Sequence, residues 1–398
     1  MIWNRQKIKD LGRVVTGKTP STKVREYFDG EYLFVTPTDL EYSHYYIRKT
    51  KTTVTKEAKE KHRSCFIPKD SVIYTCIGTI GKIAIASEEC LTNQQINSII
   101  PNLDNNFKFI YYYLIYITPQ IKTLGGGVAT PIINKTSFQN IKIQIPPLET
   151  QQKIASILSA YDDLIENNLR RIKLLEEAAR LIYKEWFVRL RFPRHEHTRI
   201  VDGLPEGWTN NIVKDFGEVL TGKTPSTKRS EYYGDDIPFI KIPDMHGNVF
   251  VIKTGQYLTK EGATTQNKKF IPKDSIVVSC IGTAGIVSLT SRTSQTNQQI
   301  NSLIPFEKSY LYYCYFTFKD LKEYMEAIGS NGATMVNVNK GKFEQMPILK
   351  PIQEILELFH NFCLPMFENI LSLQLMNEKL KEARDILLPR LMNGSIQV

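Results

Sequence analysis

The chain has 398 residues, of which 42% are hydrophobic, 11% aromatic and 23% charged, so it is long and apolar enough for two or three folded domains. Six scattered cysteines, a polar N-terminus and the lack of a long apolar run argue against a disulfide-stapled module, a secreted precursor and a membrane-spanning protein, and we expect a cytoplasmic protein with no membrane partner. The 51 lysines and arginines against 41 aspartates and glutamates give a formal net charge of +10, which favours nucleic acid as the partner.

Residues 1–148 are expected to form a mixed α/β domain. Short apolar runs alternate there with Gly, Pro, Asn and Asp, which are turn signals. Three of these runs predict strands, at residues 71–75, 82–86 and 142–145. Residues 107–124 predict a helix that stops at Gly125-Gly126-Gly127, because glycine is a poor helix former.

The apolar period changes to three or four residues at residue 149, which predicts a long amphipathic helix over residues 149–190. At 1.5 Å per residue this helix would be roughly 60 Å long. Linker residues 191–203 follow, and we expect His195 and His197 to be exposed there rather than to bind a metal. The apolar seam of the helix has a heptad-like spacing and includes Leu158, Ile165, Leu169 and Ile172.

Residues 204–349 are expected to form a second mixed α/β domain, with strands at residues 276–280 and 286–289. A second long helix is predicted over residues 350–398, starting near Pro351, where proline suits the first turn. Pro365 is expected to kink or interrupt this helix, because proline lacks the N–H that a helical hydrogen bond needs. The predicted seam of the second helix includes Phe362, Ile370, Leu373 and Leu380.

The two α/β domains are predicted to be copies of one fold, because sequence blocks return with an offset of 204 or 205 residues. The repeated blocks are residues 16–23 and 221–228, 66–71 and 270–275, and 92–98 and 296–302. A period this long is typical of domain duplication and not of a solenoid. The predicted fold class is therefore α+β, with two similar mixed α/β domains separated by two long helices. Because a helix with one apolar stripe needs a partner, we expect the helices to pack as an antiparallel coiled coil with a pseudo-two-fold axis.

A nucleotide-binding motif is suggested by Gly12–Thr19 and again by Gly217–Thr224, which match the P-loop pattern G-x-x-x-x-G-K-T. A P-loop needs an apolar strand before it and a helix after it. Polar residues 4–10 precede the first copy, and Pro20 follows it. The segment is therefore predicted as a strand, a turn at Gly17 and a polar loop.

A nuclease motif is suggested faintly by Asp39, Glu57 and Lys59, which resemble a D…E-x-K arrangement. The second copy keeps Asp244 but has Ala263 in place of the lysine. A metal-dependent nuclease site would not survive that loss, and no Ser/His/Asp order stands out elsewhere. We therefore predict no catalytic residue and no metal site in this chain.

The repeated polar loop and a basic, aromatic stretch are the candidates for DNA contact. The loop at residues 16–23 and 221–228 carries hydroxyls, ammonium groups and backbone N–H groups that could bind phosphates. Alternatively, the residues that the two copies share could serve only to hold the fold that they share. The second alternative is favoured for residues 93–100. Residues 39–64 interleave cations with aromatics, which suits either a groove-facing surface or a solvated basic loop. The predicted DNA-binding residues are Lys18, Thr19, Ser21, Lys23, Tyr45, Arg48, Lys49, Lys51, Lys82, Lys223, Thr224, Ser226, Lys228, Lys268 and Lys269.

The chain resembles the specificity subunit of Type I restriction–modification systems over essentially its whole length. Each shared motif is short, but their order and duplication make the match specific. The motifs are Gly-Lys-Thr-Pro-Ser at 17–21 and 222–226, Gln-Gln-Ile-Asn-Ser at 94–98 and 298–302, Leu-Pro-Glu-Gly-Trp at 204–208, and Ile-Pro-Pro-Leu-Glu-Thr-Gln-Gln-Lys-Ile at 145–154. Residues 348–355 keep less of the last motif.

The resemblance implies two target-recognition domains, residues 1–148 and 204–349, and two spacer helices, residues 149–190 and 350–398. It also implies a bipartite double-stranded DNA site, with two methyltransferase subunits and motor–nuclease subunits as partners. S-adenosylmethionine, ATP and Mg²⁺ would belong to those partners, and this chain would hold no cofactor. The alternatives are a specificity chain of a two-component methyltransferase–nuclease and a coiled-coil scaffold that does not bind DNA.

Identical residues cannot make two domains read different sequences, so specificity is expected where the copies diverge. The divergent stretches are residues 39–64 against 244–269 and residues 103–128 against 306–332. The extensive identity elsewhere predicts similar, nearly palindromic half-sites, although a shared scaffold would give the same identity.

Overall fold

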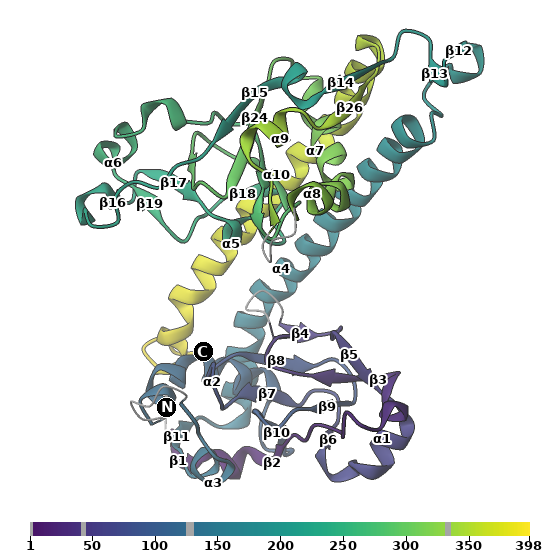
Figure 1. The fold of residues 1–398 in the computed structure, drawn as a ribbon. Coiled ribbons are helices and arrows are strands. Elements are labelled where there is room, and N and C mark those ends of the chain that lie inside the picture. The colour runs from purple at the N-terminus through teal and green to yellow at the C-terminus, as the bar shows by residue number, and fades with distance from the viewer. Residues whose placement is uncertain (1–2, 41–44, 125–130, 331–335) are drawn as a thin grey trace. The chain divides into compact units, whose positions relative to one another are not determined.

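The computed structural model describes residues 3–40, 45–124, 131–330 and 336–398 (Figure 1). It divides into two compact units. The first unit contains residues 1–167 and 377–398, and the second contains residues 168–376. Each unit therefore combines one α/β domain with part of each long helix. The predicted stop at Gly125-Gly126-Gly127 lies outside the described residues.

The α/β domain of the first unit is built from two mixed sheets and a two-stranded ribbon. Strand order is β2-β10-β7-β8-β4 in the five-stranded sheet, β5-β3-β9-β6 in the four-stranded sheet and β1-β11 in the ribbon. The strands are β1 (Asn4–Lys7), β2 (Gly12–Thr16), β3 (Phe28–Val35), β4 (Tyr46–Ile47), β5 (Thr52–Val54), β6 (Phe66–Ile67), β7 (Val72–Thr75), β8 (Ile83–Ala86), β9 (Cys90–Thr92), β10 (Ile96–Pro101) and β11 (Lys142–Ile145). The helices are α1 (Lys56–Lys61), α2 (Phe107–Leu124) and α3 (Lys135–Gln139).

The second unit repeats this topology strand for strand in its five-stranded sheet, which has the order β15-β24-β20-β22-β18. Its four-stranded sheet has the order β16-β19-β17-β23, and β14 pairs with β26. The strands are β14 (Thr209–Ile212), β15 (Gly217–Thr221), β16 (Tyr233–Gly234), β17 (Ile237–Ile240), β18 (Phe250–Val251), β19 (Tyr257–Leu258), β20 (Ile276–Ser279), β22 (Val287–Thr290), β23 (Gln295–Thr296), β24 (Ile300–Pro305) and β26 (Pro347–Lys350). The shorter elements are the pairs β12 (Ile200–Val201) with β13 (Leu204–Pro205) and β21 (Ile281–Gly282) with β25 (Val336–Asn337), and helices α5 (Ile242–Met245), α6 (Lys260–Thr264), α7 (Tyr310–Asp320), α8 (Lys322–Gly329) and α9 (Lys340–Glu344). The predicted duplication of a mixed α/β domain is confirmed.

Helices α4 (Leu148–Tyr183) and α10 (Gln353–Met392) pass from one unit into the other, and α4 continues as a π-helical turn over Lys184–Val188. In the first unit, Asp162 in the first half of α4 pairs with Arg384 near the end of α10. In the second unit, the ring of Tyr183 at the end of α4 lies 6.3 Å from that of Phe359 near the start of α10. The two helices therefore run antiparallel, as predicted.

Most of the residues predicted for the apolar seam are buried or half-buried. Leu158 and Ile165 are buried in the first unit, and Ile172, Ile370 and Leu373 are buried in the second. Leu169 and Leu380 are half-buried.

The structure contradicts two expectations for α10, the burial of Phe362 and an interruption at Pro365. Phe362 is 42% exposed, because the buried face of the helix here follows Phe359, Cys363 and Phe367 at intervals of four residues. Pro365 does not interrupt the helix, which runs unbroken through that position.

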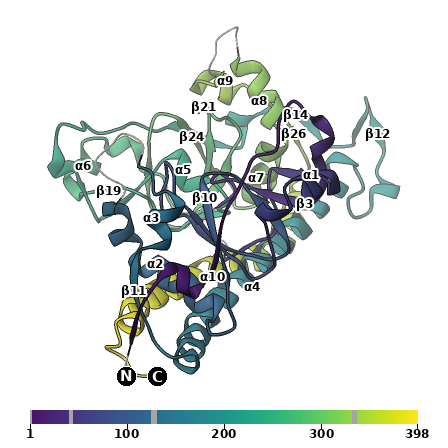
Figure 2. The same cartoon turned by 90° about the horizontal axis from the view of Figure 1, so that it is seen from below.

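Each α/β core is completed by the helices. In the first unit, Leu388, Leu391 and Met392 of α10 share one cluster with Ile154 and Leu158 of α4 and with the inner face of α2. Trp3, Ile396 and Val398 pack against the same cluster, so both ends of the described chain lie on this unit (Figures 1 and 2). No helix of the described residues is long and apolar enough to cross a membrane.

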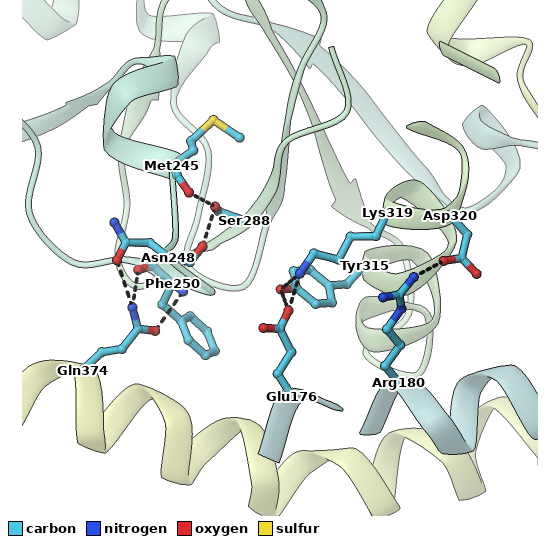
Figure 3. A network of polar contacts seen from close by, with 10 residues as sticks. All are labelled: Glu176, Arg180, Met245, Asn248, Phe250, Ser288, Tyr315, Lys319, Asp320 and Gln374. Carbon is cyan, nitrogen blue, oxygen red and sulfur yellow. Dashed lines mark hydrogen bonds and ion pairs between the residues drawn. The ribbon is translucent and has the colours of Figure 1, made fainter. Parts of the chain in front are cut away.

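Polar side chains of the helices also fix the edge strands of the five-stranded sheets. In the second unit, Gln374 of α10 accepts a hydrogen bond from the Phe250 N–H (3.0 Å) and donates one to the Phe250 carbonyl (3.1 Å) (Figure 3). In the first unit, Glu166 of α4 accepts one from the Tyr46 N–H (3.2 Å). Tyr46 and Phe250 begin the equivalent strands β4 and β18, so both copies use the same device.

The ion pairs that the two long helices make differ in burial. The carboxylate of Asp162 is 6% exposed and pairs with Arg384, whose side chain is 19% exposed. Burial raises the pKa of the Asp162 carboxyl, and Arg384 opposes that effect. In the second unit, Arg180 pairs with Asp320 at 3.2 Å, with side chains 48% and 29% exposed (Figure 3).

Substitution of Arg384 by Met should destabilise the first unit by about 3–5 kcal/mol, because it leaves the Asp162 carboxylate buried without its counter-charge. Unfolding in denaturant, followed by tryptophan fluorescence and circular dichroism, would measure this. As the matched control, Arg180→Met should cost less than about 1 kcal/mol, since its pair is solvated. Equal losses for the two variants would contradict the argument from burial.

Candidate nucleic-acid interface

The repeated loop at residues 17–23 is joined by hydrogen bonds to the repeated turn at residues 92–95. The Gly17 N–H donates to the Ile96 carbonyl (3.1 Å), and the Lys18 N–H donates to the Thr92 carbonyl (2.8 Å). The Thr19 hydroxyl donates to Gln94 Oε1 (2.5 Å). Strand β2 leads straight into this loop and no α-helix follows it before β3, so the prediction of a strand and polar loop rather than a P-loop is confirmed.

Buried asparagines shape the turn that receives the loop. Asn93 Nδ2 donates to Gln95 Oε1 (3.0 Å), and Asn93 Oδ1 accepts from the Gln95 N–H (3.1 Å). Asn97 Oδ1 accepts from the Thr16 hydroxyl (2.6 Å). With only 7% and 3% of their surfaces exposed, Asn93 and Asn97 hold the fold, in line with the interpretation favoured for this block.

The second copy reproduces the arrangement. Lys223 N–H donates to the Thr296 carbonyl (3.0 Å), and the Thr224 hydroxyl donates to Gln298 Oε1 (2.5 Å). Asn301 Oδ1 accepts from the Thr221 hydroxyl (2.6 Å). In each copy, the repeated loop and the repeated turn therefore contact one another through equivalent hydrogen bonds.

A third segment, which sequence reasoning missed, lies at the same end of the sheet. The Cys76 N–H donates to the Gln95 carbonyl (2.8 Å), and the Cys280 N–H donates to the Gln299 carbonyl (2.8 Å). Residues 76–79 return intact as 280–283, which is a repeat signal as clear as the others. Burial raises the pKa of both cysteine thiols to about 12, so they stay protonated and serve packing rather than chemistry.

This end of the sheet, which we call the polar frame, consists of residues 17–23, 92–95 and 76–79 and their counterparts 222–228, 296–299 and 280–283. The frame exposes cations, hydroxyls and amides in both copies. The exposed residues include Lys18, Ser21, Thr22, Lys23, Thr79 and Gln94 in the first copy, and Lys223, Ser226, Thr227, Lys228, Thr283 and Gln298 in the second. Thr19 and Thr224 are half-buried beneath them.

Lys268 and Lys269 lie beside the second frame, because Gln266 donates from Nε2 to the Lys223 carbonyl (2.9 Å). The first copy has His62 at the place of Gln266. Burial lowers the pKa of the His62 imidazole, and the charges of Lys18 and Lys61 add to the shift.

The structure does not place the other predicted DNA contacts together. Tyr45 is only 2% exposed and packs edge-on against the Tyr111 ring at 5.0 Å, so its assignment to DNA contact is wrong. Burial raises the pKa of its phenol, which keeps the group neutral. Arg48 pairs with Glu166 at 3.1 Å, and Lys82 donates to the Pro37 carbonyl (2.8 Å). Lys49 and Lys51 are exposed.

Asp39, from the faint nuclease pattern, and its counterpart Asp244 hold loops in place by accepting backbone hydrogen bonds. Asp39 accepts from the N–H groups of Thr36 (2.8 Å) and Lys51 (2.9 Å). Asp244 accepts from those of Lys241 (2.8 Å) and Gly255 (2.8 Å) in the same way. Among the described residues, no cluster of three or more His, Cys, Asp or Glu could hold a metal ion.

The docking of the loop depends on a glycine, because a Cβ on Gly17 would lie 2.2 Å from the Thr92 carbonyl oxygen. Gly17→Ala should therefore lower the free energy of unfolding by about 1–3 kcal/mol, since backbone has to move to relieve the overlap. Chemical denaturation would measure this. Gly341→Ala is the control: its Cβ would come no closer than 3.6 Å to a neighbouring atom and it lies in α9, so we expect no loss. An unchanged stability for Gly17→Ala would refute the close fit.

Comparisons with known proteins agree with this duplicated architecture. The family model of the Type I restriction modification DNA specificity domain matches residues 2–177 and 205–364. The chain is 30% identical to the Type I restriction enzyme MjaIX specificity subunit of Methanocaldococcus jannaschii, over 100% of this chain and 94% of that protein. It is 35% identical to the Type I restriction enzyme HindI specificity subunit of Haemophilus influenzae, over 67% of this chain and 71% of that protein.

The fold is similar to that of the crystallised Type I restriction–modification S subunit from M. genitalium, with a TM-score of 0.58 and 16% identity, covering 98% of this chain and 96% of that one. The family domain matches twice, one relative matches over the full length, and the fold is shared with a solved structure. The chain belongs to the family of Type I restriction–modification DNA specificity subunits.

Proposed function

We propose that this chain is the non-catalytic recognition subunit of a Type I restriction–modification complex, and that each α/β domain reads one half of a bipartite DNA site. The observation that carries the proposal is the polar frame, which occurs twice with the same hydrogen bonds and exposes Lys18 and Lys223 at equivalent places. Ammonium, hydroxyl and amide groups on one surface are the groups that bind phosphates and base edges.

Differences between the half-sites would arise beside the frame, where equivalent residues differ in chemistry. Thr36 is replaced by Lys241, whose ammonium group donates to Gln256 Oε1 (2.6 Å). Lys82 is replaced by Ile286. Each copy thus has one lysine near the loop that follows β3 or β17, but Lys82 directly precedes β8 and Lys241 directly follows β17, and the two bind different partners.

The long helices are proposed to dock two methyltransferase subunits. In the second unit, α4 exposes Leu174 and Leu181, which are 60% and 59% exposed and seven residues apart. In the first unit, α4 exposes Ile157 and Leu164 at the same spacing. A seven-residue spacing puts side chains on one face of a helix, and an exposed apolar stripe is typical of a partner helix interface. The motor–nuclease subunits, and S-adenosylmethionine, ATP and Mg²⁺, would belong to the rest of the complex.

Methylome sequencing tests the proposed function. When the chain is expressed with its methyltransferase in a methylation-free host, native DNA should carry a bipartite modified motif that vanishes when this chain is omitted. A stable complex that methylates no new motif would refute DNA recognition and favour a scaffold.

Substitution of Lys18 or Lys223 by Ala should weaken DNA binding of the methyltransferase complex on all sequences, because each would lose a phosphate contact. The slope of log affinity against log salt should become shallower by about 0.9 for each lysine. Fluorescence anisotropy over a salt series would measure this slope. Lys379→Ala, which removes an exposed lysine of α10, is the control. An unchanged slope would remove these lysines from the interface.

Leu181→Glu should weaken binding of the methyltransferase subunit roughly tenfold or more, because a charge would replace an apolar contact in the docking stripe. Because Leu181 is exposed, the substitution should not disturb folding, and the temperature of thermal unfolding should stay unchanged. Titration calorimetry would measure the affinity, with Lys173→Gln, off the stripe, as a control that lowers the net charge by the same one unit. Equal effects of the two substitutions would contradict docking on this stripe.

A further inference from the structure

Gln94 and Gln298 differ from the other identical residues of their repeated blocks, because they are exposed. Asn93 and Asn97, with Asn297 and Asn301 in the second copy, have at most 7% of their surface exposed. The asparagines explain why the blocks are shared, since they hold the turn and the adjoining strands. They do not explain why an exposed glutamine is identical in both copies.

A threonine hydroxyl fixes each of these glutamines. Thr19 donates to Gln94 Oε1 at 2.5 Å, and Thr224 donates to Gln298 Oε1 at 2.5 Å, across 75 and 74 residues of sequence. An amide oxygen has two lone pairs and an amide nitrogen has two N–H groups. One lone pair and both donors therefore remain for a ligand, on a side chain whose freedom the threonine has already reduced.

The loop and the turn beneath each glutamine are both tied to the sheet. The Lys18 N–H bonds to the Thr92 carbonyl, and the Asn93 side chain closes the turn onto Gln95. The backbone of the loop and of the turn is thus fixed, and the hydroxyl is the group that bonds to the amide itself. A positioned amide with one acceptor and one donor side by side matches the N6 and N7 edge of adenine in the major groove.

We propose that Gln94 and Gln298 each read an adenine at the equivalent position of the two half-sites, with Thr19 and Thr224 as positioning residues. The proposal rests on the proposed function, because it takes the polar frame to face DNA. On this proposal, the residues beside the frame that differ between the copies read the bases that differ between the half-sites. The two glutamines read a base that both half-sites share.

The test uses the complete methyltransferase complex and the methylomes of the wild type, Gln94→Leu and Gln298→Leu. The wild-type motif should contain an adenine at the same place in each half. Gln94→Leu should relax that position in one half-site only, and Gln298→Leu in the other, with discrimination against other bases falling roughly 5- to 150-fold. Each variant is the matched control for the other.

Substitutions of Thr19 test its positioning role separately from any role in folding. Thr19→Val should reduce discrimination at the same base without altering the rest of the half-site, whereas Thr19→Ser, which keeps the hydroxyl, should restore it. Thermal unfolding of each variant identifies loss of the fold. If a variant does not fold, 7-deazaadenine in a synthetic duplex removes the N7 acceptor instead, and wild-type binding should fall by a similar factor.

Three results would overturn the proposal while leaving the proposed function intact. They are a bipartite motif without a shared adenine, an unchanged base preference in both glutamine variants, and a loss of affinity equal for all sequences, which would indicate a backbone contact. A wild-type complex without any sequence-specific methylation would instead overturn the proposed function itself.

Discussion

Burial of the helix faces in the cores of the two units is the constraint on which the rest of the structure depends. Near the end of α4, Tyr183 and Phe187 pack against Phe359 of α10, and the Phe187 ring lies 4.8 Å from that of Tyr313 in α7. An amphipathic helix of 36 residues would not be stable alone, and the sheets of each unit need the helices to cover them. Neither part is complete without the other, so each α/β domain folds with portions of both helices. This is why the compact units do not coincide with the domains that composition suggests.

The residues of the polar frame that are identical in the two copies are of two kinds, buried and exposed. Asn93 and Asn97 are identical because the turn needs them, and their amides are buried and bonded. Gln94 lies between them in sequence and is exposed. Burial, and not the repeat itself, separates a residue that holds the fold from one that is available to a ligand.

Local patterns predicted the elements well and the long-range contacts poorly. The strand at 142–145 has the predicted bounds, because Pro146 and Pro147 follow it directly, and α2 covers the residues predicted as helix, 107–124. Tyr45 was wrongly assigned to a DNA-facing surface, since a basic stretch in sequence does not reveal that one of its aromatics enters the core beside Tyr111. Phe362 was placed on the seam by spacing alone, although Cys363 is the buried residue.

Polar groups that hold the helices could not be predicted from spacing, because their partners are distant in sequence. Gln374 binds the backbone of Phe250, 124 residues away, and Arg384 pairs with Asp162, 222 residues away. Each looks like an ordinary polar position on a solvated helix face until the fold brings its partner to it. Only three-dimensional contact distinguishes these side chains from their solvated neighbours.

These buried polar contacts restrict the register of the helices in a way that the apolar seam does not. A seam of Ile, Leu and Phe tolerates a shift by one heptad, because another apolar side chain takes each vacated place. The same shift would leave the Asp162 carboxylate buried without Arg384, and the Phe250 N–H without Gln374. An unpaired buried charge or N–H group costs far more than an altered apolar contact. The polar contacts therefore select one alignment of each helix on its unit, and since each domain core is built on that alignment, they also determine where its polar frame lies along the helix.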